Sequence, residues 1–339
     1  MKALKHIGIF TLLLLPVALI GCGDEDGVAP PPPPPQLELV TFSVPDLPDN
    51  DVYDILVDSQ DRIWVCTQNG VGLRIGNQWY KIDQGDGLPN PRTRRAVEFN
   101  GKIWIATWGG GIGIFKNNAW ITITEAHGLP DGAVFDIAVD DTSIWFGTVN
   151  GVVQYRDNDA IPMANRWIDH TSKATGPEVA DIEIAEATSR GSEVWFGSKF
   201  DWVGVWRPVS LERVTYTRNN SGIPGTGVNT IAYNPLDGIF WVGFFSEGLA
   251  SVDVDISTWR HYTTMDGLPS MVIHSVAVDD DGVVWVGTQG GLGKLKGDRF
   301  IAFTKGSGIP AERVRRVYVD EQNRVWLAFI DGGVGRITR

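Results

Sequence analysis

A run of glycines is the first place where this sequence could hold chemistry. Gly109, Gly110 and Gly111 stand in a row, and Gly113 follows two residues later. A dinucleotide-binding loop needs the spacing G-x-G-x-x-G after a strand and at the start of a helix. Here the third glycine would have to replace Lys116, and the residues that follow alternate as in a strand. The spacing therefore excludes a phosphate-binding loop and indicates a hairpin turn.

The histidines and aspartates predict no catalytic residue, metal site or cofactor. No two of the five histidines have the spacing of a metal-binding pair; they are His6, His127, His170, His261 and His274. The acidic run 279–282 lacks the alternation of a calcium loop. Similar segments recur at 58–61 and 320–323, and Asp and Asn at such places indicate turns.

Arginine pairs and turn aromatics are the stronger candidates for binding. Arg94-Arg95 and Arg315-Arg316 stand out in a chain of net charge −12, and arginine forks bind carboxylate or sulfate well, as an acidic sugar would require. Salt bridges to Asp51 and Asp54 are the alternative role. Aromatic faces can hold the apolar face of a pyranose or pack against a neighbouring repeat; the candidates are Trp108, Trp202 and Phe245.

Internal repeats define the fold that must position these residues. A segment similar to VWVGTQGG occurs seven times, and its tryptophans are 40 to 50 residues apart: Trp64, Trp104, Trp145, Trp195, Trp241, Trp285 and Trp326. This period is typical of propeller blades. Each copy contains four alternating segments separated by turns, which predicts one four-stranded antiparallel sheet. The chain is therefore expected to be all-β, a seven-bladed β-propeller.

Packing and ring closure follow from this architecture. We expect the tryptophans in the core, and close approach of the next blade at the small residues two positions later: Cys66, Ala106, Gly147, Gly197, Gly243, Gly287 and Ala328. The last copy stops after three strands, whereas an extra strand in 37–44 precedes the first copy. That strand is expected to complete the seventh blade and close the ring over residues 37–339.

We aligned the seven copies on the proline that precedes each innermost strand. Two successive positions of this alignment are mostly polar, here called the first and second columns, and the next position is apolar. The first column is Tyr53, Arg94, Phe135, Ile182, Asn229, His274 and Arg315. The second is Asp54, Arg95, Asp136, Glu183, Thr230, Ser275 and Arg316, and Ile184 follows in the fourth copy. We expect both columns to ring the mouth of the central channel, where closure brings the four arginines together around Tyr53 and Asp54.

The repeat VDDDGVVWVGTQGGLGKLK, followed by D-G-L-P or G-I-P, resembles the two-component regulator propeller repeat. The resemblance covers residues 37–339 and is weaker at Trp195 and Trp241. In that family the propellers form the periplasmic sensing half of membrane histidine kinases, with polysaccharide fragments among the inferred signals. No kinase or second membrane segment follows the repeats here. The resemblance therefore implies the propeller fold and a ligand-binding role, but it implies no signalling activity.

The N-terminus predicts export and lipid anchoring. Lys2 and Lys5 precede a short apolar run over 7–20, which is typical of a signal peptide covering 1–21. The tetrad 19–22 resembles a bacterial lipobox, which implies lipid on Cys22; an ordinary secretory peptide is the alternative. An acidic and proline-rich tether over 22–36 should act as a spacer. We expect a lipid-anchored protein of the bacterial cell envelope, at the outer membrane.

The net charge and the cysteine content limit which binding partners and disulfide bonds are expected. Loss of the signal peptide leaves 27 basic and 41 acidic residues, which argues against nucleic acid as a partner. Cys66 then has no partner for a disulfide and is expected to be buried. The sequence thus predicts a non-catalytic binding or sensing propeller, with an oligosaccharide as one candidate ligand. The alternatives are a propeller lyase that uses His274 and a divalent metal, and a scaffold for a protein partner such as a separate receptor.

Overall fold

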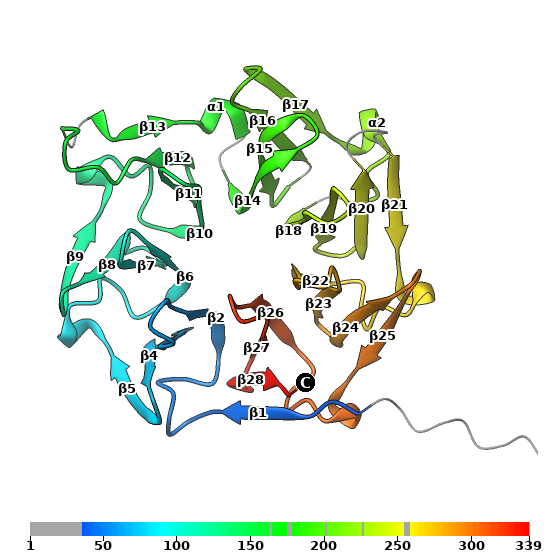
Figure 1. Cartoon of the computed structure of the whole chain (residues 1–339), viewed down its shortest axis with the longest axis horizontal. Coiled ribbons are helices and arrows are strands. Elements are labelled where there is room, and N and C mark those ends of the chain that lie inside the picture. Colours follow the sequence, from blue (N-terminus) through cyan, green and yellow to red (C-terminus); the bar gives the residue numbers. More distant parts are fainter. Residues whose placement is uncertain are drawn as a thin grey trace, which may run out of the picture. The chain divides into compact units, whose positions relative to one another are not determined.

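Seven four-stranded antiparallel sheets surround a central axis, and one strand of each sheet lies nearest to it (Figure 1). The computed structural model describes residues 36–162, 165–174, 178–200, 202–225, 227–253 and 258–338. The predicted signal peptide, Cys22 and the tether up to residue 35 lie outside these residues. Within them, no helix is both long enough and apolar enough to cross a membrane.

The seven sheets, here called blades 1 to 7, follow one another in chain order. Blade 1 contains β2 (Val52–Val57), β3 (Ile63–Thr67), β4 (Gly70–Ile75) and β5 (Gln78–Ile82); blade 2 contains β6 (Thr93–Phe99), β7 (Lys102–Thr107), β8 (Ile112–Lys116) and β9 (Ala119–Ile123). Blade 3 contains β10 (Val134–Val139), β11 (Ile144–Thr148), β12 (Gly151–Tyr155) and β13 (Trp167–Asp169); blade 4 contains β14 (Val179–Thr188), β15 (Gly191–Ser198), β16 (Val203–Arg207) and β17 (Glu212–Tyr216). Blade 5 contains β18 (Val228–Asn234), β19 (Ile239–Phe244), β20 (Leu249–Asp253) and β21 (Thr258–Tyr262); blade 6 contains β22 (Ile273–Val278), β23 (Val284–Thr288), β24 (Gly291–Lys296) and β25 (Arg299–Phe303). Blade 7 contains β26 (Val314–Val319), β27 (Val325–Phe329), β28 (Val334–Ile337) and β1 (Leu39–Phe42).

The N-terminal strand closes the ring, as predicted. Strand β1 pairs antiparallel with β28, with Leu39 opposite Ile337 and Phe42 opposite Val334, so the two ends of the described chain share one sheet (Figure 1). Because β1 pairs with β28, the edge of β28 is not left open to pair with another chain.

Short turns and single helical turns connect the strands. One-turn helices lie before the Gly-Leu-Pro or Gly-Ile-Pro segments: η1 (Gln84–Asp86), η2 (Glu125–His127), α2 (Arg218–Ser221), η4 (Thr264–Asp266) and η5 (Lys305–Ser307). Helix α1 (Thr171–Ala174) lies between blades 3 and 4. The glycine run of blade 2 is a hairpin turn between β7 and β8. Gly111 has a φ of 77°, and a Cβ there would lie 2.1 Å from the carbonyl oxygen of Ile123, so this turn requires glycine.

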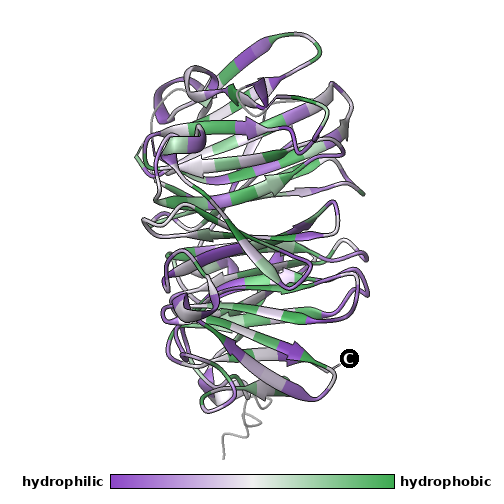
Figure 2. Cartoon of the chain, turned by 90° about the vertical axis from the view of Figure 1, so that its left-hand side faces the viewer, coloured by the Kyte–Doolittle hydropathy of each residue, from purple (hydrophilic) through white to green (hydrophobic). Residues whose placement is uncertain are grey.

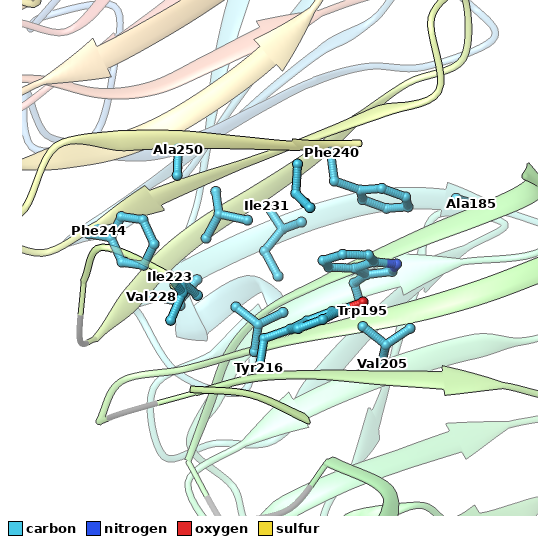
Figure 3. Close-up of a cluster of buried hydrophobic side chains, with 13 residues drawn as sticks. Ala185, Trp195, Val205, Tyr216, Ile223, Val228, Ile231, Phe240, Phe244 and Ala250 are labelled. Atoms are coloured by element: carbon cyan, nitrogen blue, oxygen red, sulfur yellow. The ribbon is translucent and has the colours of Figure 1, made fainter. Parts of the chain in front are cut away.

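The core lies between adjacent blades, as in the buried cluster shared by blades 4 and 5, and both hydrophobic and hydrophilic residues occur along the strands (Figure 2). All seven repeat tryptophans are at most 3% exposed. Between blades 4 and 5, Trp195 stacks on Phe240 with ring centroids 4.0 Å apart (Figure 3). A Cβ added to Gly243 would lie 2.5 Å from Cγ2 of Ile273 in the next blade, which confirms close approach at the small-residue column.

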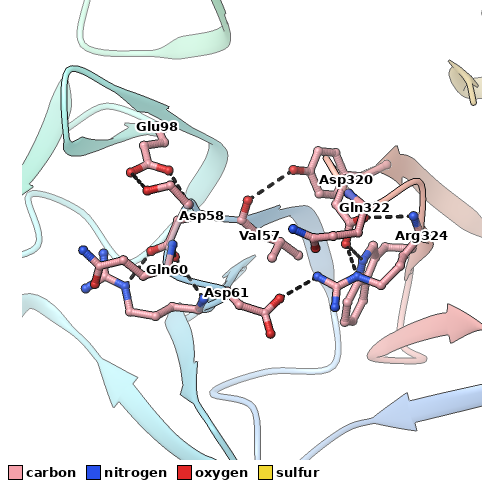
Figure 4. A network of polar contacts seen from close by, with 12 residues as sticks. Val57, Asp58, Gln60, Asp61, Glu98, Asp320, Gln322 and Arg324 are labelled. Carbon is pink, nitrogen blue, oxygen red and sulfur yellow. Dashed lines mark hydrogen bonds and ion pairs between the residues drawn. The ribbon is translucent and has the colours of Figure 1, made fainter. Parts of the chain in front are cut away.

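The aspartate turns between first and second strands hold the tryptophans in place. Asp58 accepts hydrogen bonds from the backbone amides of Gln60 and Arg62, and the indole N–H of Trp64 donates to its Oδ2 over 2.8 Å. The same indole-to-aspartate bond recurs in blades 3, 6 and 7. Asp61 also reaches Arg324 of blade 7 over 2.7 Å (Figure 4). The turn interpretation of these aspartates is therefore confirmed.

Candidate functional site

Every innermost strand carries an irregularity at the same place. In all seven blades the pairing of the first strand with the second skips one residue, as between Val52 and Asp54 in blade 1. The skipped residues, here called the bulge residues, are Tyr53, Arg94, Phe135, Ala180, Asn229, His274 and Arg315. A β-bulge interrupts the strict alternation of side chains. The bulge residue therefore faces the channel in every blade, and the residue after it does so in some of them.

The bulge residues converge on a cavity of about 600 Å³ at one mouth of the channel. All seven line it. The residue after the bulge also reaches it in four blades, and two residues come from turns between second and third strands: these are Arg95, Asp136, Asp181, Arg316, Lys199 and Phe245. The volume falls in the range of small-molecule sites.

Most of the residues predicted from the sequence gather at this mouth. Seven of the ten line the cavity: Tyr53, Arg94, Arg95, Phe245, His274, Arg315 and Arg316. Asp54 is 2% exposed and contacts Arg95 and Arg316. Trp108 stands beside Arg94, whose guanidinium carbon is 4.6 Å from the indole centroid. Trp202 does not line the mouth; it packs against the buried cluster that contains Trp145 and Phe196.

The structure corrects the sequence alignment in blade 4. Counting from Pro177 places Ile182 and Glu183 in the two polar columns, but the strand register places Ala180 and Asp181 there. Asp181 lies opposite Gly197, as Asp54 lies opposite Cys66. The count is wrong by two because the connection into blade 4 has a different length. Ile184 is likewise not the equivalent of Ile55; Ile182 is.

The residue after the bulge links neighbouring blades. Oδ2 of Asp54 accepts a hydrogen bond from the backbone N–H of Ala96 over 2.9 Å, and Asp136 accepts one from Ile182 over 2.8 Å. Asp181, Thr230 and Ser275 repeat this bond to the next blade. Blades 2 and 7 differ, because Arg95 and Arg316 stand at this position and a guanidinium has no acceptor.

These two arginines form ion pairs with the aspartates instead. Nε of Arg95 lies 3.1 Å from Asp136 and its Nη1 lies 3.7 Å from Asp54, while Nε of Arg316 lies 3.3 Å from Asp54. Above them, Arg315 pairs with Asp51 over 2.7 Å. Three of the four arginines therefore make the inter-blade contacts of the alternative interpretation. The exception is Arg94.

Burial perturbs the remaining carboxyl groups of the channel. Desolvation, reinforced by Asp136, raises the pKa of Asp181 well above its ordinary value. Desolvation also raises the pKa of Glu183 to about 7, although its Oε1 accepts a hydrogen bond from the N–H of Tyr233. Asp54 and Asp136 lie beside Arg95 and Arg316, so these charges at the floor of the mouth offset one another.

His274 lies in a cationic setting. Its Nε2 is 3.0 Å from Oε1 of Gln289, and burial lowers its pKa, with further lowering by Arg315 and Arg313. In the described part of the chain, no three His, Cys, Asp or Glu side chains are grouped as metal ligands. Nearby arginines disfavour a divalent cation, so the surroundings of His274 suit a neutral hydrogen-bonding role better than metal ligation.

Comparison with known proteins supports the repeat assignment. The sequence profile of the family described as "Two component regulator propeller" matches residues 46–69 and 267–290, so the predicted resemblance is confirmed at these repeats. No curated protein sequence matches the chain.

Solved structures share the fold at low sequence identity. The extracellular domain of a hybrid two-component system from B. thetaiotaomicron superposes with a TM-score of 0.73 at 17% identity, over 90% of this chain and 42% of that one. The extracellular domain of a one-component system from the same organism gives 0.68 at 16%, over 89% and 39%. Virginiamycin B lyase from Staphylococcus aureus, with quinupristin, gives 0.68 at 14%, over 90% and 99%. This chain thus spans about two fifths of the two extracellular domains.

Sequence reasoning missed several lining residues. Phe135 and Asn229 stand in the predicted column but carry no charge that singles them out. Ala180 and Asp181 were hidden by the misaligned fourth copy, and Lys199 lies in a turn whose sequence departs from the repeat. A bulge at a fixed position would have explained why two successive residues are polar in most copies.

Proposed function

We propose that this chain is a non-catalytic binding or sensing propeller that holds a small ligand, an oligosaccharide, at the channel mouth. The convergence of seven bulge residues on one cavity carries this proposal. Their identities differ from blade to blade, whereas the strands that carry them pair in the same register. Such a difference is expected when the scaffold is repeated and the ligand is not symmetric.

The lining of the mouth suits a polar ligand with apolar faces. Phe135 and Phe245 offer aromatic surface, and Asn229 and His274 offer hydrogen bonds. Phe245 is 64% exposed, so its ring is available for stacking on a sugar. Most of the polar side chains lie on β-strands, which gives them fixed positions before a ligand arrives.

Two rival functions use other features of the chain. A lyase mechanism would require a metal or an acid–base pair beside His274; the arginines near it disfavour a metal, and its side-chain hydrogen-bond partner is Gln289, which cannot exchange a proton. The lyase among the similar structures shares the fold at 14% identity, which does not carry its reaction to this chain. A scaffold would instead use exposed apolar side chains such as Phe200, Val209 and Leu211.

Location follows from the N-terminal sequence and from the proteins that share the fold. We infer an extracytoplasmic protein, anchored by lipid on Cys22 to the outer membrane of a bacterium. The lipobox-like tetrad supports the anchor, and the domains of the two-component and one-component systems that share the fold are described as extracellular.

A cavity-filling variant tests the proposed function. Ala180 is the one small bulge residue, and the six equivalent positions hold Asn or larger side chains, so Ala180→Trp should fill the mouth without disturbing the blade. Oligosaccharide ligands found by calorimetric or thermal-shift screening of the protein should lose binding to Ala180→Trp. The matched control is Ala119→Trp, on the exposed outer strand β9. Ligands that bind Ala180→Trp as well as the unmodified protein would place their site elsewhere.

A further inference from the structure

Cations and aromatic rings alternate in one arc around the mouth, from blade 7 to blade 4. Arg315 lies over Tyr53 at 3.9 Å, and Arg94 lies 4.4 Å from the same ring. Arg94 is also 4.6 Å from the Trp108 ring, which contacts Phe135 at 5.0 Å between centroids. Nζ of Lys199 completes the arc, 3.3 Å from the Phe135 centroid. The arc therefore places three cations on one wall of the cavity.

Two of these cations form no ion pair with a carboxylate of the described residues. Arg315 is paired with Asp51 over 2.7 Å. In contrast, the side chains of Arg94 and Lys199 make neither a hydrogen bond nor an ion pair within the described part of the chain, although Nε of Arg94 is shielded from solvent. Arg94 is half-buried and Lys199 is exposed at the rim, so a bound anion would supply the counter-ion that the partly desolvated guanidinium of Arg94 lacks.

Arg94 and Lys199 are close enough to contact one ligand. Arg94 and Nζ of Lys199 lie 4.6 Å and 5.9 Å from the same Trp108 ring, and both residues line the cavity. Desolvation and the charge of Arg94 together lower the pKa of Lys199 to about 8, against the attraction of Glu178. The two groups therefore repel each other across a space that is open to a ligand.

The opposite wall is neutral. Asn229, Phe245 and His274 face the cavity from blades 5 and 6, and the lowered pKa of His274 keeps its ring uncharged at neutral pH. The anionic part of a ligand would thus bind to the wall with the cations, and its neutral part would bind to the opposite wall of the mouth. The asymmetry fixes an orientation as well as a charge preference.

We propose, resting on the function above, that the ligand carries a carboxylate or sulfate group, and that this group is bound between Arg94 and Lys199. The guanidinium of Arg94, sandwiched between Tyr53 and Trp108, offers donors of fixed direction. Lys199 adds a mobile ammonium from the turn of blade 4. An acidic oligosaccharide, uronate-containing or sulfated, meets both demands.

The test compares charged sugars with partners that differ only in charge. Calorimetry on the purified full-length protein would use uronate-containing disaccharides beside their methyl esters, and sulfated disaccharides beside the unsulfated parents. We expect at least one charged member to bind roughly tenfold more tightly than its neutral partner. The two sets identify whether carboxylate or sulfate is preferred. Binding should weaken at high pH, where Lys199 loses its proton.

Variants identify the residues responsible. Arg94→Gln and Lys199→Gln should each reduce the affinity for the charged sugar roughly tenfold and leave the neutral partner unaffected. Arg313→Gln is the matched control, because Arg313 is already paired with exposed Asp331 over 2.6 Å. Equal binding of charged and neutral partners, lost in Ala180→Trp, would overturn the anion site and leave the proposed function standing. Absence of binding by every sugar in both sets would overturn both.

Discussion

Oδ1 of Asp54 lies 3.3 Å from Nε of Arg316, although the two residues come from opposite ends of the chain. The side chain of Asp54 is 3% exposed and that of Arg316 is 19% exposed. Ring closure brings blade 7 beside blade 1, and Arg95 of blade 2 approaches the same carboxylate from the other side. One carboxylate therefore joins three blades near the axis.

Loss of the Asp54 charge should destabilise the ring. Asp54→Asn can still accept the hydrogen bond from Ala96, but it leaves Arg316 without its only ion pair seen in the described residues and weakens that of Arg95. We expect a loss of about 3 kcal/mol in the free energy of unfolding, because a buried cation loses its partner. Asp61→Asn, which removes an exposed partner of Arg324, should cost about 1 kcal/mol or less in the same urea titration. Equal losses would show that Asp54 acts as an ordinary surface charge.

The fold could be predicted from the sequence because its determinants are local and repeated. Trp64 and its equivalents recur in one sequence context, and each strand and turn of a blade is built from neighbouring residues. Closure was predictable for the same reason, since the last copy lacked the strand that the N-terminus supplied. Because the same pattern recurs in seven copies, a strand that is missing from one copy can be recognised by comparison with the others.

The site was less predictable because it depends on the details of register. No particular residue type marks the bulge at Tyr53 and its equivalents. Counting from the preceding proline misaligned the fourth copy, because the connection before it differs in length. Whether an arginine pairs with an aspartate or stays free also depends on distances that the sequence does not contain. Arg94 and Arg95 are adjacent in the chain, yet among the described residues Arg95 is paired with carboxylates and Arg94 is not.

The raised pKa of Glu183 predicts a pH dependence of stability. The pKa of the Glu183 carboxyl rises from its ordinary value of 4.5 to about 7 in the folded protein. Between these two pH values the folded state holds a proton that the unfolded state has lost. Stability should therefore fall as pH rises from 4.5 to about 7, and change little from this group above that range.

Glu183→Gln should remove this part of the pH dependence and stabilise the protein at pH values above 7. Glutamine keeps an acceptor for the N–H of Tyr233 and carries no charge to desolvate. Glu98→Gln is the control, since Glu98 accepts hydrogen bonds from Ser59 at a turn of blade 1. Unfolding free energies at several pH values provide the measurement. A slope that persists in Glu183→Gln would assign the dependence to another group.

Removal of the closing strand should damage the whole ring. Deletion of residues 37–45 removes β1 and exposes the edge of β28, so we expect a large fall in melting temperature together with aggregation. A chain that starts at Gln36 is the matched control, because it retains β1. Melting temperatures within a degree or two of each other would show that β1 contributes little to closure.

The lipid anchor is tested at Cys22. Cys22→Ser removes the thiol that the lipobox interpretation requires, so the protein should no longer incorporate labelled palmitate or partition into detergent. The other cysteine, Cys66, is fully buried, and burial raises the pKa of its thiol, which makes it a suitable control. Label that persists in Cys22→Ser and disappears in Cys66→Ser would contradict the anchor.

Arg94 and Arg316 should respond in opposite ways to the same substitution. Arg316→Gln leaves the longer contact to Arg95 as the one ion pair of Asp54 among the described residues, so the free energy of unfolding should fall by about 3 kcal/mol. Arg94→Gln removes a cation that has no carboxylate partner among the described residues, so stability should change by less than about 1 kcal/mol. Affinity for a charged sugar should show the reverse order, with the larger loss in Arg94→Gln, because Arg316 is held by Asp54 while Arg94 is free to pair with the ligand. Urea titration and calorimetry on both variants give four values. A stability loss in Arg94→Gln as large as that in Arg316→Gln, with unchanged affinity, would make Arg94 a structural residue and remove it from the binding site.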